Sequence, residues 1–584
     1  MKNTIKYLFF IGILYLFSAC KDELKFGNNF LSKPPLSTAV NKDTVFSNIT
    51  YAERFLYGAY STLPFGQSAA DGNNFGSGSS FYLDCLTDMI NTDLVPAVPY
   101  YVNLYDAYVE NNYIGKYRWT FGGWPGIRKA NIFLANIGRV PNVDAAYRKQ
   151  LIAEARMIMA VHYTELYRNY GGMIWINHEL AVTETGPFPR LTSVATMDSI
   201  VSLIDRAVPD LPWVITDQVN WDGRFTKAAA MALKARVLLF GASPLFNSAA
   251  PYMDGEAAQK KLVWNGSYDP NLWKRAADAA AALISRVESE GGYRIVKTGN
   301  PRKDFQNGYY TRGTGETLIS TRTVFLYPDD DRTLGPIKWS GTGTYTQEYV
   351  DMFPMANGLP ITDPASGFNP NDPYVNRDPR LYETVLVNGD SYQGRTAELF
   401  LGGRERLSKK DLPALTGYGP RKFVLERNTA TNLGSIVQWP YLRLPEVYLS
   451  CAEALNEVNN GPTAEAYRCV NLVRNRVNLS NLPAGLSKDQ FREAVLNERA
   501  CEFGFERVRW YDIIRWKKED VFKRQLHGMD ITKSGSTLSY ATFPLTPIRY
   551  WSTNWSPKWY LSAFPANEIL KGTGLIQNPG WEIN

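Results

Sequence analysis

Apolar residues recur at helical spacing through much of the chain. The longest run covers 144–170, where Leu151, Ala155, Ile158 and Leu166 would lie on one face of a helix. Two glycines directly after residue 170 predict its end. The same spacing predicts further helices over 119–137, 196–208, 226–242, 271–288, 444–458, 463–477 and 487–506.

Two segments indicate how these helices pack. Residues 444–477 form a helix–turn–helix unit of about 34 residues, the period of tetratricopeptide repeats. The segment 226–242 is rich in alanine, and small side chains let helices approach closely. Between 251 and 440 the pattern changes, because Gly, Pro, Asn and Asp become frequent and 317–325 reads as a strand. We therefore expect a mainly α protein in which tetratricopeptide-like helical hairpins form a scaffold for a loop-rich variable region.

The helix predicted from residue 487 carries an unusual run of acids. Ser487 and Gln490 have the spacing of a capping box at its start. Glu498, Glu502 and Glu506 follow at intervals of four and would share one helix face, where like charges repel unless cations pair with them. The interpretation that we adopt is a buried ion-pair network with arginines; the alternative is a pair of catalytic carboxylates.

The N-terminus has the pattern of a lipoprotein signal. Lys2 and Lys6 precede a short apolar run, and small residues stand directly before Cys20. We expect residues 1–19 to be the signal peptide and Cys20 to be the lipidated N-terminus. Two or more acyl chains on one cysteine give stable membrane anchoring. Residues 20–45 are polar, contain Pro34 and Pro35, and would tether the lipid to the fold.

Composition adds a hint about the ligand. Aromatic residues make up 13% of the chain, with 35 Tyr, 28 Phe and 15 Trp. Such an excess suits a ligand with flat apolar faces, such as sugar rings, although a large core also uses many aromatics. The net charge of +6 comes without a basic run interleaved with aromatics, which excludes a nucleic-acid partner.

Metal and cofactor chemistry find no support in the sequence. The three histidines are far apart, and His162 lies on an apolar helical stripe, as a core histidine would. Cys85, Cys451, Cys469 and Cys501 form no Cys-x-x-Cys pair, and their disulfide pairing is left open. The acidic triplet 329–331 is either a solvated turn or a calcium ligand set. We expect no cofactor and no metal.

Two regions concentrate aromatic side chains in what the pattern predicts to be loops. The first is 94–118, a long segment crowded with tyrosines, and the second lies in the middle block. Each aromatic residue alone is more often part of the core or of an interface than a ligand contact. Our candidate ligand-binding residues are Tyr100, Tyr101, Asn103 and Tyr105 in the first region and Tyr309, Tyr310, Trp339 and Tyr345 in the second.

Several segments in order give the chain a family resemblance. They include WPGIRKANIFLANI, ELYRNYGG, KAAAMALKARVLLFGASP, YLRLPEVYLSCAEALNE, LNERACEFGFERVRWYDIIRW and the terminal IQNPGW. Together with the lipoprotein N-terminus they resemble the SusD/RagB family of outer-membrane nutrient-binding lipoproteins over nearly the whole chain. The acidic residues after Cys20 also resemble the surface-export signal of lipoproteins in the Bacteroidetes. Between 544 and 564 the chain departs from the family pattern, with two separate FP segments around a Trp-rich spacer.

The resemblance implies a function. A member of this family sits on a SusC-like TonB-dependent transporter, captures oligosaccharide at the cell surface and needs no cofactor. It implies an N-terminal helical region at 46–250, a variable ligand-binding region at 251–440 and a C-terminal helical region at 441–584. Peptide or other nutrient cargo is the alternative within the family. A glycoside hydrolase, which needs two carboxylates across a cleft, and a purely structural interaction protein remain the alternatives outside it.

Overall fold

The computed structural model describes residues 41–64, 66, 83–84, 86–91, 123–324, 344–406, 416–423, 436–545 and 555–582. Its helices in the first half are α2 (Lys42–Val45), α3 (Ile49–Tyr60), α7 (Trp124–Asn136), α8 (Ala145–Tyr170), α9 (Ser193–Ala207), α10 (Gln218–Trp221), α11 (Lys227–Ala242), α12 (Glu256–Gln259) and α13 (Pro270–Glu290). Those in the second half are α14 (Pro301–Tyr310), α16 (Gln347–Met352), α17 (Pro379–Thr384), α18 (Leu444–Val458), α19 (Ala464–Arg476), α20 (Lys488–Glu502), α21 (Arg509–Arg515), α22 (Glu519–Lys523) and α24 (Ala566–Leu570).

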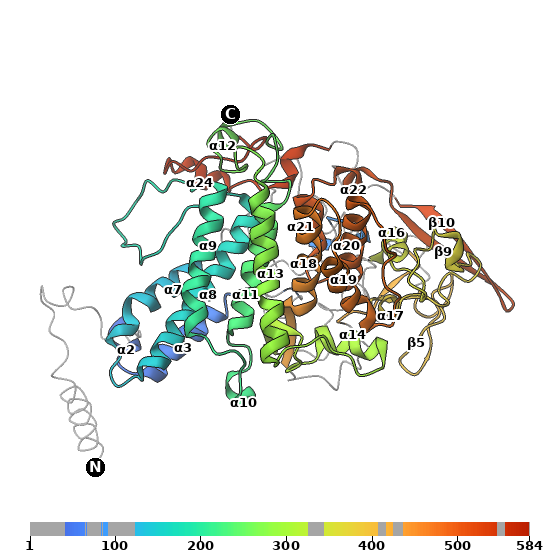
Figure 1. Ribbon diagram of the computed structural model, residues 1–584, viewed down its shortest axis with the longest axis horizontal. Helices are drawn as coiled ribbons and strands as arrows, with labels where there is room; N and C mark the ends of the chain where they lie inside the picture. The colour runs from blue at the N-terminus through green and yellow to red at the C-terminus, as the bar shows by residue number, and fades with distance from the viewer. Residues whose placement is uncertain are drawn as a thin grey trace, which may run out of the picture.

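The long helices stand side by side in a row that follows the chain (Figure 1). Helix α7 packs on α8, α8 on α9, α9 on α11, α11 on α13, and α13 on α18, which in turn contacts α19 and α20. Each helix therefore shares its apolar surface mainly with its neighbours in the stack, as in helical-repeat proteins. The predicted mainly α, tetratricopeptide-like scaffold is confirmed.

Local sequence explains where these helices begin and end. The side chain of Asp144 caps α8 through the backbone N–H of Tyr147, and Gly171 ends it with a positive φ of 82°. Ser487 and Gln490 form the predicted capping box at the start of α20. Most of α11 is buried, as expected for an alanine-rich helix with neighbours on several sides.

The strands are short and pair two by two in antiparallel fashion. They are β1 (Ile90–Asn91), β2 (Thr317–Val324), β3 (Thr344–Tyr345), β4 (Val385–Leu386), β5 (Ser391–Tyr392), β6 (Arg395–Thr396), β7 (Gly419–Pro420), β8 (Ile436–Arg443), β9 (His527–Ser534) and β10 (Thr537–Pro544). The pairs are β1 with β3, β2 with β8, β4 with β7, β5 with β6, and β9 with β10. The β9–β10 hairpin projects from the C-terminal half (Figure 1).

Two local expectations were wrong. Tyr309 and Tyr310 are not in a loop but form the last turn of α14. The helix that begins at Lys488 does not continue to Glu506, because it ends at Glu502 and a turn with positive φ at Phe505 and Arg507 precedes α21.

The predicted ion-pair network is present around the end of α20. It comprises Glu316, Asp378, Arg380, Lys422, Arg443, Arg474, Arg476, Glu498, Glu502 and Glu506, all of them buried; we call it the buried charge network. Glu502 alone accepts hydrogen bonds from Arg443, Arg380 and Arg476, the first two at 3.0 and 3.1 Å. Burial would raise the pKa of Glu502, but these three guanidinium groups outweigh burial and lower it.

The other cysteine and histidine expectations can be followed in the described residues. Cys451, Cys469 and Cys501 are buried free thiols, and Cys85 lies outside the described residues. His162 is buried on α8 with its Nε2 atom 2.9 Å from the hydroxyl of Thr62, so it is a core histidine as predicted. Within the described ranges, no helix has both the length and the hydropathy needed to cross a bilayer.

Candidate ligand-binding site

The short β1–β3 pair brings together the ends of the two aromatic regions that the sequence singled out. Asn91, the last residue of β1, pairs with Thr344, the first residue of β3, and Ile90 pairs with Tyr345. The segment that begins after Asn91 contains the first aromatic region, and the segment that ends before Thr344 contains Trp339. Two stretches far apart in sequence are therefore attached to the scaffold at adjacent points.

Most of the candidate residues lie outside the described part of the chain. These are Tyr100, Tyr101, Asn103, Tyr105 and Trp339, together with the lipidation candidate Cys20 and the acidic triplet 329–331. Their assignment stays a prediction. The structure shows where the segments that contain these tyrosines, Asn103 and Trp339 join β1 and β3.

The structure does describe Tyr309, Tyr310 and Tyr345. Tyr309 is 0% exposed, and its ring lies edge-on to the rings of Phe305 and Phe423 at 5.2 and 5.1 Å. Tyr345 is 2% exposed and packs edge-on against Phe505 at 4.7 Å, while Tyr310 is half-buried. Tyr309 and Tyr345 are thus core aromatics here, which is the alternative that the sequence had left open, and a ligand at the surface reaches neither ring.

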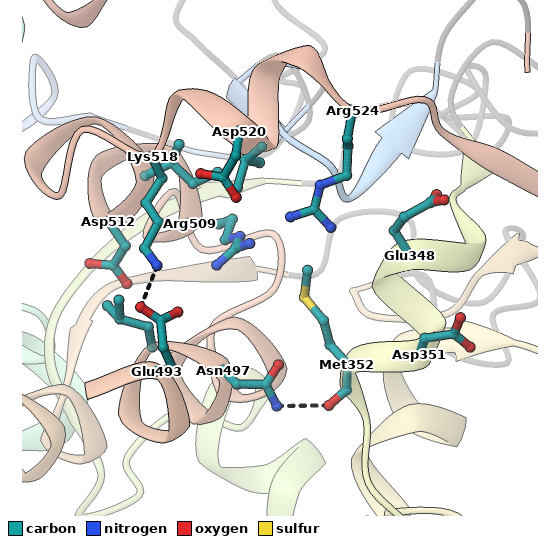
Figure 2. A pocket seen from close by; sticks show the side chains of 13 residues that line it. Glu348, Asp351, Met352, Glu493, Asn497, Arg509, Asp512, Lys518, Asp520 and Arg524 are labelled. Atoms are coloured by element: carbon teal, nitrogen blue, oxygen red, sulfur yellow. Dashed lines mark hydrogen bonds and ion pairs between the residues drawn. The ribbon is translucent and has the colours of Figure 1, made fainter. Parts of the chain in front are cut away.

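A cavity of about 390 Å³ opens beside this strand pair, and we call it the charged cleft. Figure 2 shows its walls: α16 contributes Glu348, Asp351 and Met352, and α20 contributes Glu493 and Asn497. The remaining polar side chains come from α21, α22 and the residues flanking them: Arg509, Asp512, Lys518, Asp520 and Arg524.

Asp88 connects the charged cleft to β1. It is fully buried two residues before that strand, and the guanidinium of Arg509 binds both of its oxygens at 3.1 and 2.9 Å. Arg524 adds a second cation at 3.3 Å. Burial opposes ionisation of Asp88, but the two arginines outweigh it and lower its pKa. The base of β1 is therefore held by an ion triad that borders the cleft.

Three carboxylates of the charged cleft are engaged in structural contacts. Glu348 accepts hydrogen bonds from the backbone N–H of His527 at 2.9 Å and contacts its ring, and Glu493 pairs with Lys518. Asp512 pairs with Arg499 at 2.7 Å. In Figure 2 the carboxylates of Glu348 and Asp351 lie on the opposite side of the view from Glu493 and Asp512.

Asp351 is a carboxyl group of the cleft with a raised pKa. Burial raises its pKa, against the opposing effects of the Gln347 amide and of Arg377. A raised pKa alone is a weak sign of a general acid, since structural carboxyls show it too. The cleft is lined by aliphatic and charged side chains and offers hydrogen bonds rather than an aromatic platform for a sugar ring.

No motif in the sequence marks the residues of the charged cleft as a site. The sequence does show a high density of charged residues at 509–524, directly after the predicted ion-pair network. Charges of that kind usually form a solvated face, so they do not indicate a site. Among the described residues no group of three His, Cys, Asp or Glu side chains is placed to hold a metal ion.

Comparison with known proteins identifies relatives over most of the chain. The model of the SusD family matches residues 305–581. A SusD-like protein of Formosa agariphila is 44% identical over 420 residues, which cover 67% of this chain and 68% of the relative. Another SusD-like protein of that organism is 42% identical over 83 residues, and this match spans 13% of the chain and 16% of that relative.

Solved structures show the same fold. A SusD-like protein from Bacteroides fragilis superposes with a TM-score of 0.71 at 23% identity, and the match covers 94% of this chain and 100% of that one. A second structure from that organism, described as a SusD-like carbohydrate-binding protein, gives a TM-score of 0.67 at 19% identity and covers 92% of this chain and 100% of its own. At these identities the likeness establishes the fold alone.

Proposed function

Because the chain belongs to the SusD family, we propose that it is a lipid-anchored protein of the outer membrane that binds glycans at the cell surface. It delivers the bound glycan to a SusC-like TonB-dependent transporter and does not cleave it. Its anchor is Cys20, and its ligand-binding residues are Tyr100, Tyr101, Asn103 and Tyr105 of the first aromatic region and Trp339 of the second, while Tyr309 and Tyr345 belong to the core.

The observation that carries this proposal is the β1–β3 pair. It places the start of 92–122 next to the end of 325–343, and these two segments contain Tyr100, Tyr101 and Trp339. Aromatic side chains bind the C–H faces of sugar rings, and a few hydrogen bonds then orient the sugar. Binding residues placed on loops above a rigid scaffold are a common arrangement for recognition.

Calorimetric titration tests the glycan assignment. The soluble protein from residue 21 onward is titrated with neutral and acidic oligosaccharides and with peptides of similar length. We expect a saccharide to bind, and we expect combined substitution of Tyr100, Tyr101 and Trp339 by alanine to weaken binding at least about tenfold. Substitution of Tyr51, an exposed tyrosine on α3, is the matched control.

Each outcome of the titration has a clear meaning. Binding of peptides in place of saccharides would replace the cargo and keep the transporter role. An unchanged affinity in the triple variant would remove the aromatic regions from the site. Release of reducing ends from any of the saccharides would contradict a purely binding function and would turn attention to the carboxylates of the charged cleft.

The anchor and the partner need a separate test in cells. With Cys20→Ala we expect the protein to leave the membrane fraction, because the acyl chains attach to that thiol. Affinity purification of the anchored protein from outer membranes should recover a TonB-dependent transporter. Recovery of the protein in the membrane fraction despite Cys20→Ala would contradict the proposed anchor.

A further inference from the structure

A second and smaller cavity, of about 180 Å³, lies at the start of β2 and is lined by arginines and glycines. Its walls are the segment 214–226 before α11, the turn 292–294 after α13 and the residues 313–322 that lead into and along β2. The polar side chains that line it include those of Arg224, Arg294, Thr314 and Arg322. We call this cavity the arginine pocket.

Three residues that line the arginine pocket each carry a buried donor without an acceptor. Arg224 is 7% exposed, and it donates through Nε to Glu154 at 2.9 Å and through Nη1 to the Tyr147 hydroxyl at 3.3 Å. Its Nη2 atom has no hydrogen-bond partner. The Nε atom of Arg322 and the hydroxyl of Thr314 are buried and unpartnered as well. A buried donor without an acceptor costs free energy, so three of them around one cavity need an explanation.

The pocket also has more cations than anions. Asp222 accepts from both Arg312 and Arg322, each at 2.7 Å, and therefore compensates only one of them. Burial lowers the pKa of Arg322, and repulsion from Arg312 adds to this effect while Asp222 opposes it. Arg294 is exposed at the mouth and makes no ion pair with any residue of the described ranges.

The absence of a side chain at Gly223 leaves room for the guanidinium of Arg322. Gly223 has a φ of 91°, which favours glycine, and a Cβ atom there would lie 1.5 Å from Nη1 of Arg322. Nη1 and Nη2 of Arg322 bind the backbone oxygen and the carboxylate of Asp222 at 3.2 and 2.7 Å. The guanidinium is thus fixed against the backbone before any ligand arrives, which reduces the entropy lost on binding.

We propose that the arginine pocket binds an oxyanion carried on a sugar, either a sulfate ester or a uronate carboxylate. Oxygen acceptors of this kind satisfy planar guanidinium donors with strong, charge-assisted hydrogen bonds. Arg322 stands two residues before the end of β2, where the segment 325–343 with Trp339 begins. The inference rests on the proposed glycan-binding function and specifies its ligand as an acidic glycan.

A titration of matched oligosaccharides tests the specificity. Sulfated, uronate-containing and neutral oligosaccharides of equal length are titrated into the wild type and into Arg294→Gln and Arg322→Gln at low ionic strength, where charge contacts are least screened. We expect an acidic class to bind at least about tenfold more tightly than the neutral one, and the ratio to fall about tenfold in each variant. Tighter binding of the sulfated oligosaccharides would identify a sulfate ester as the ligand group, and tighter binding of the uronate-containing ones would identify a carboxylate.

The control is Arg275→Gln, which removes an exposed arginine that pairs with Asp198 on the scaffold at 2.6 Å. It changes the net charge by the same amount and should leave the acidic-to-neutral ratio unaltered. An equal effect of Arg275→Gln and Arg294→Gln would reduce the preference to general charge attraction and would overturn the pocket. Equal binding of acidic and neutral saccharides would overturn it too, while leaving glycan binding intact.

A measurement independent of glycans separates the two proposals. Crystals of the wild type and of Arg322→Gln are soaked in sodium selenate, whose selenium is located by anomalous scattering. We expect a peak between Arg224 and Arg322 that is absent from the variant. If no saccharide binds but selenate does, the oxyanion pocket stands and the glycan function fails; if selenate is absent from the wild-type pocket, the inference fails.

Discussion

The buried charge network and the arginine pocket both contain buried arginines and carboxylates, but they differ in how these charges are balanced. In the network, Glu498, Glu502 and Glu506 each accept from at least two cations, although Nε of Arg476 is also buried without an acceptor. In the pocket, Arg224 and Arg322 each keep a buried nitrogen without an acceptor. An unpartnered buried nitrogen therefore does not by itself separate the two regions, whereas the supply of carboxylates does, since Asp222 is the one acid among the residues that line the pocket.

The difference has an energetic basis. A buried ion pair returns little net stability against apolar residues of the same size, but loss of one member leaves its partners uncompensated and is strongly destabilising. The network is thus a set of mutually dependent charges that joins α17, α19 and α20 with β8. In the arginine pocket one carboxylate, that of Asp222, is shared by Arg312 and Arg322, and the proposed oxyanion would add further acceptors.

The largest effect is expected from Glu502→Ala. Removal of this carboxylate leaves Arg380, Arg443 and Arg476 short of an acceptor in a buried site, and we expect the free energy of unfolding to fall by about 3–5 kcal/mol. Chemical denaturation measures it, with Glu493→Ala on the exposed face of the same helix as the control at about 1 kcal/mol or less. Glycan binding should persist in the fraction that folds. An unchanged melting temperature would break the distinction between the two regions.

Acid should weaken the network without any mutation. The pKa of Glu502 is lowered in the folded protein below its ordinary value of 4.5, so the unfolded chain binds a proton more readily. The stability from this group is therefore present above about pH 4.5, the ordinary pKa. It is lost as the pH falls from there toward the lower pKa of the folded protein. Stability measured against pH should decline more steeply below pH 4.5 in the wild type than in Glu502→Gln. Parallel curves would show that Glu502 does not contribute to the acid response.

The smallest effect, and one of opposite sign, is expected from Asp84→Asn. Asp84 lies near Lys422 and Glu506 but is fully buried with both carboxylate oxygens unpartnered, and burial raises its pKa well above 3.8. A raised carboxyl pKa gives stability that is present below pH 3.8 and lost as the pH rises through the folded value. The asparagine variant should thus be more stable at neutral pH by about 1–3 kcal/mol.

The measurement that checks Asp84→Asn is denaturation at pH 7 and at pH 3.5. The gain over the wild type should be seen at pH 7 and should disappear at pH 3.5, where the wild-type carboxyl is protonated. A loss of stability at both values would mean that Asp84 belongs to the satisfied network. That result would mean that Asp84 has partners in the folded protein, like the acids of the buried charge network.

The elements that the sequence predicted best are those whose signals are local. The capping box of Ser487 and Gln490, the end of α8 at Gly171 and the hairpin of α18 and α19 all follow from residues close together in the chain. That Glu502 needs cationic partners also followed from the spacing of the acids. Which arginines serve could not be predicted, because Arg380 and Arg443 come from separate segments that only the tertiary fold brings to α20.

The candidate site shows the same limit. Aromatic density predicted Tyr309 and Tyr345 as ligand contacts, yet aromatic side chains fill cores as readily as they line sites, and only packing decides between the two. The arginine pocket had a weak signal in RGTGETLISTR, where glycines stand beside two arginines. Its meaning depends on Arg224 and Asp222 from a distant loop, so no local pattern could have identified it.

The two-residue β1–β3 pair has a consequence for engineering. Ile90 and Asn91 meet Thr344 and Tyr345 through backbone pairing, which does not depend on the identity of the residues beyond Asn91 or before Thr344. At these two junctions the pairing makes few demands on the side chains of the residues that follow Asn91 or precede Thr344. A library with 92–122 and 325–343 replaced together would test the proposed recognition while the sequences of β1, β3 and the helical stack are kept constant.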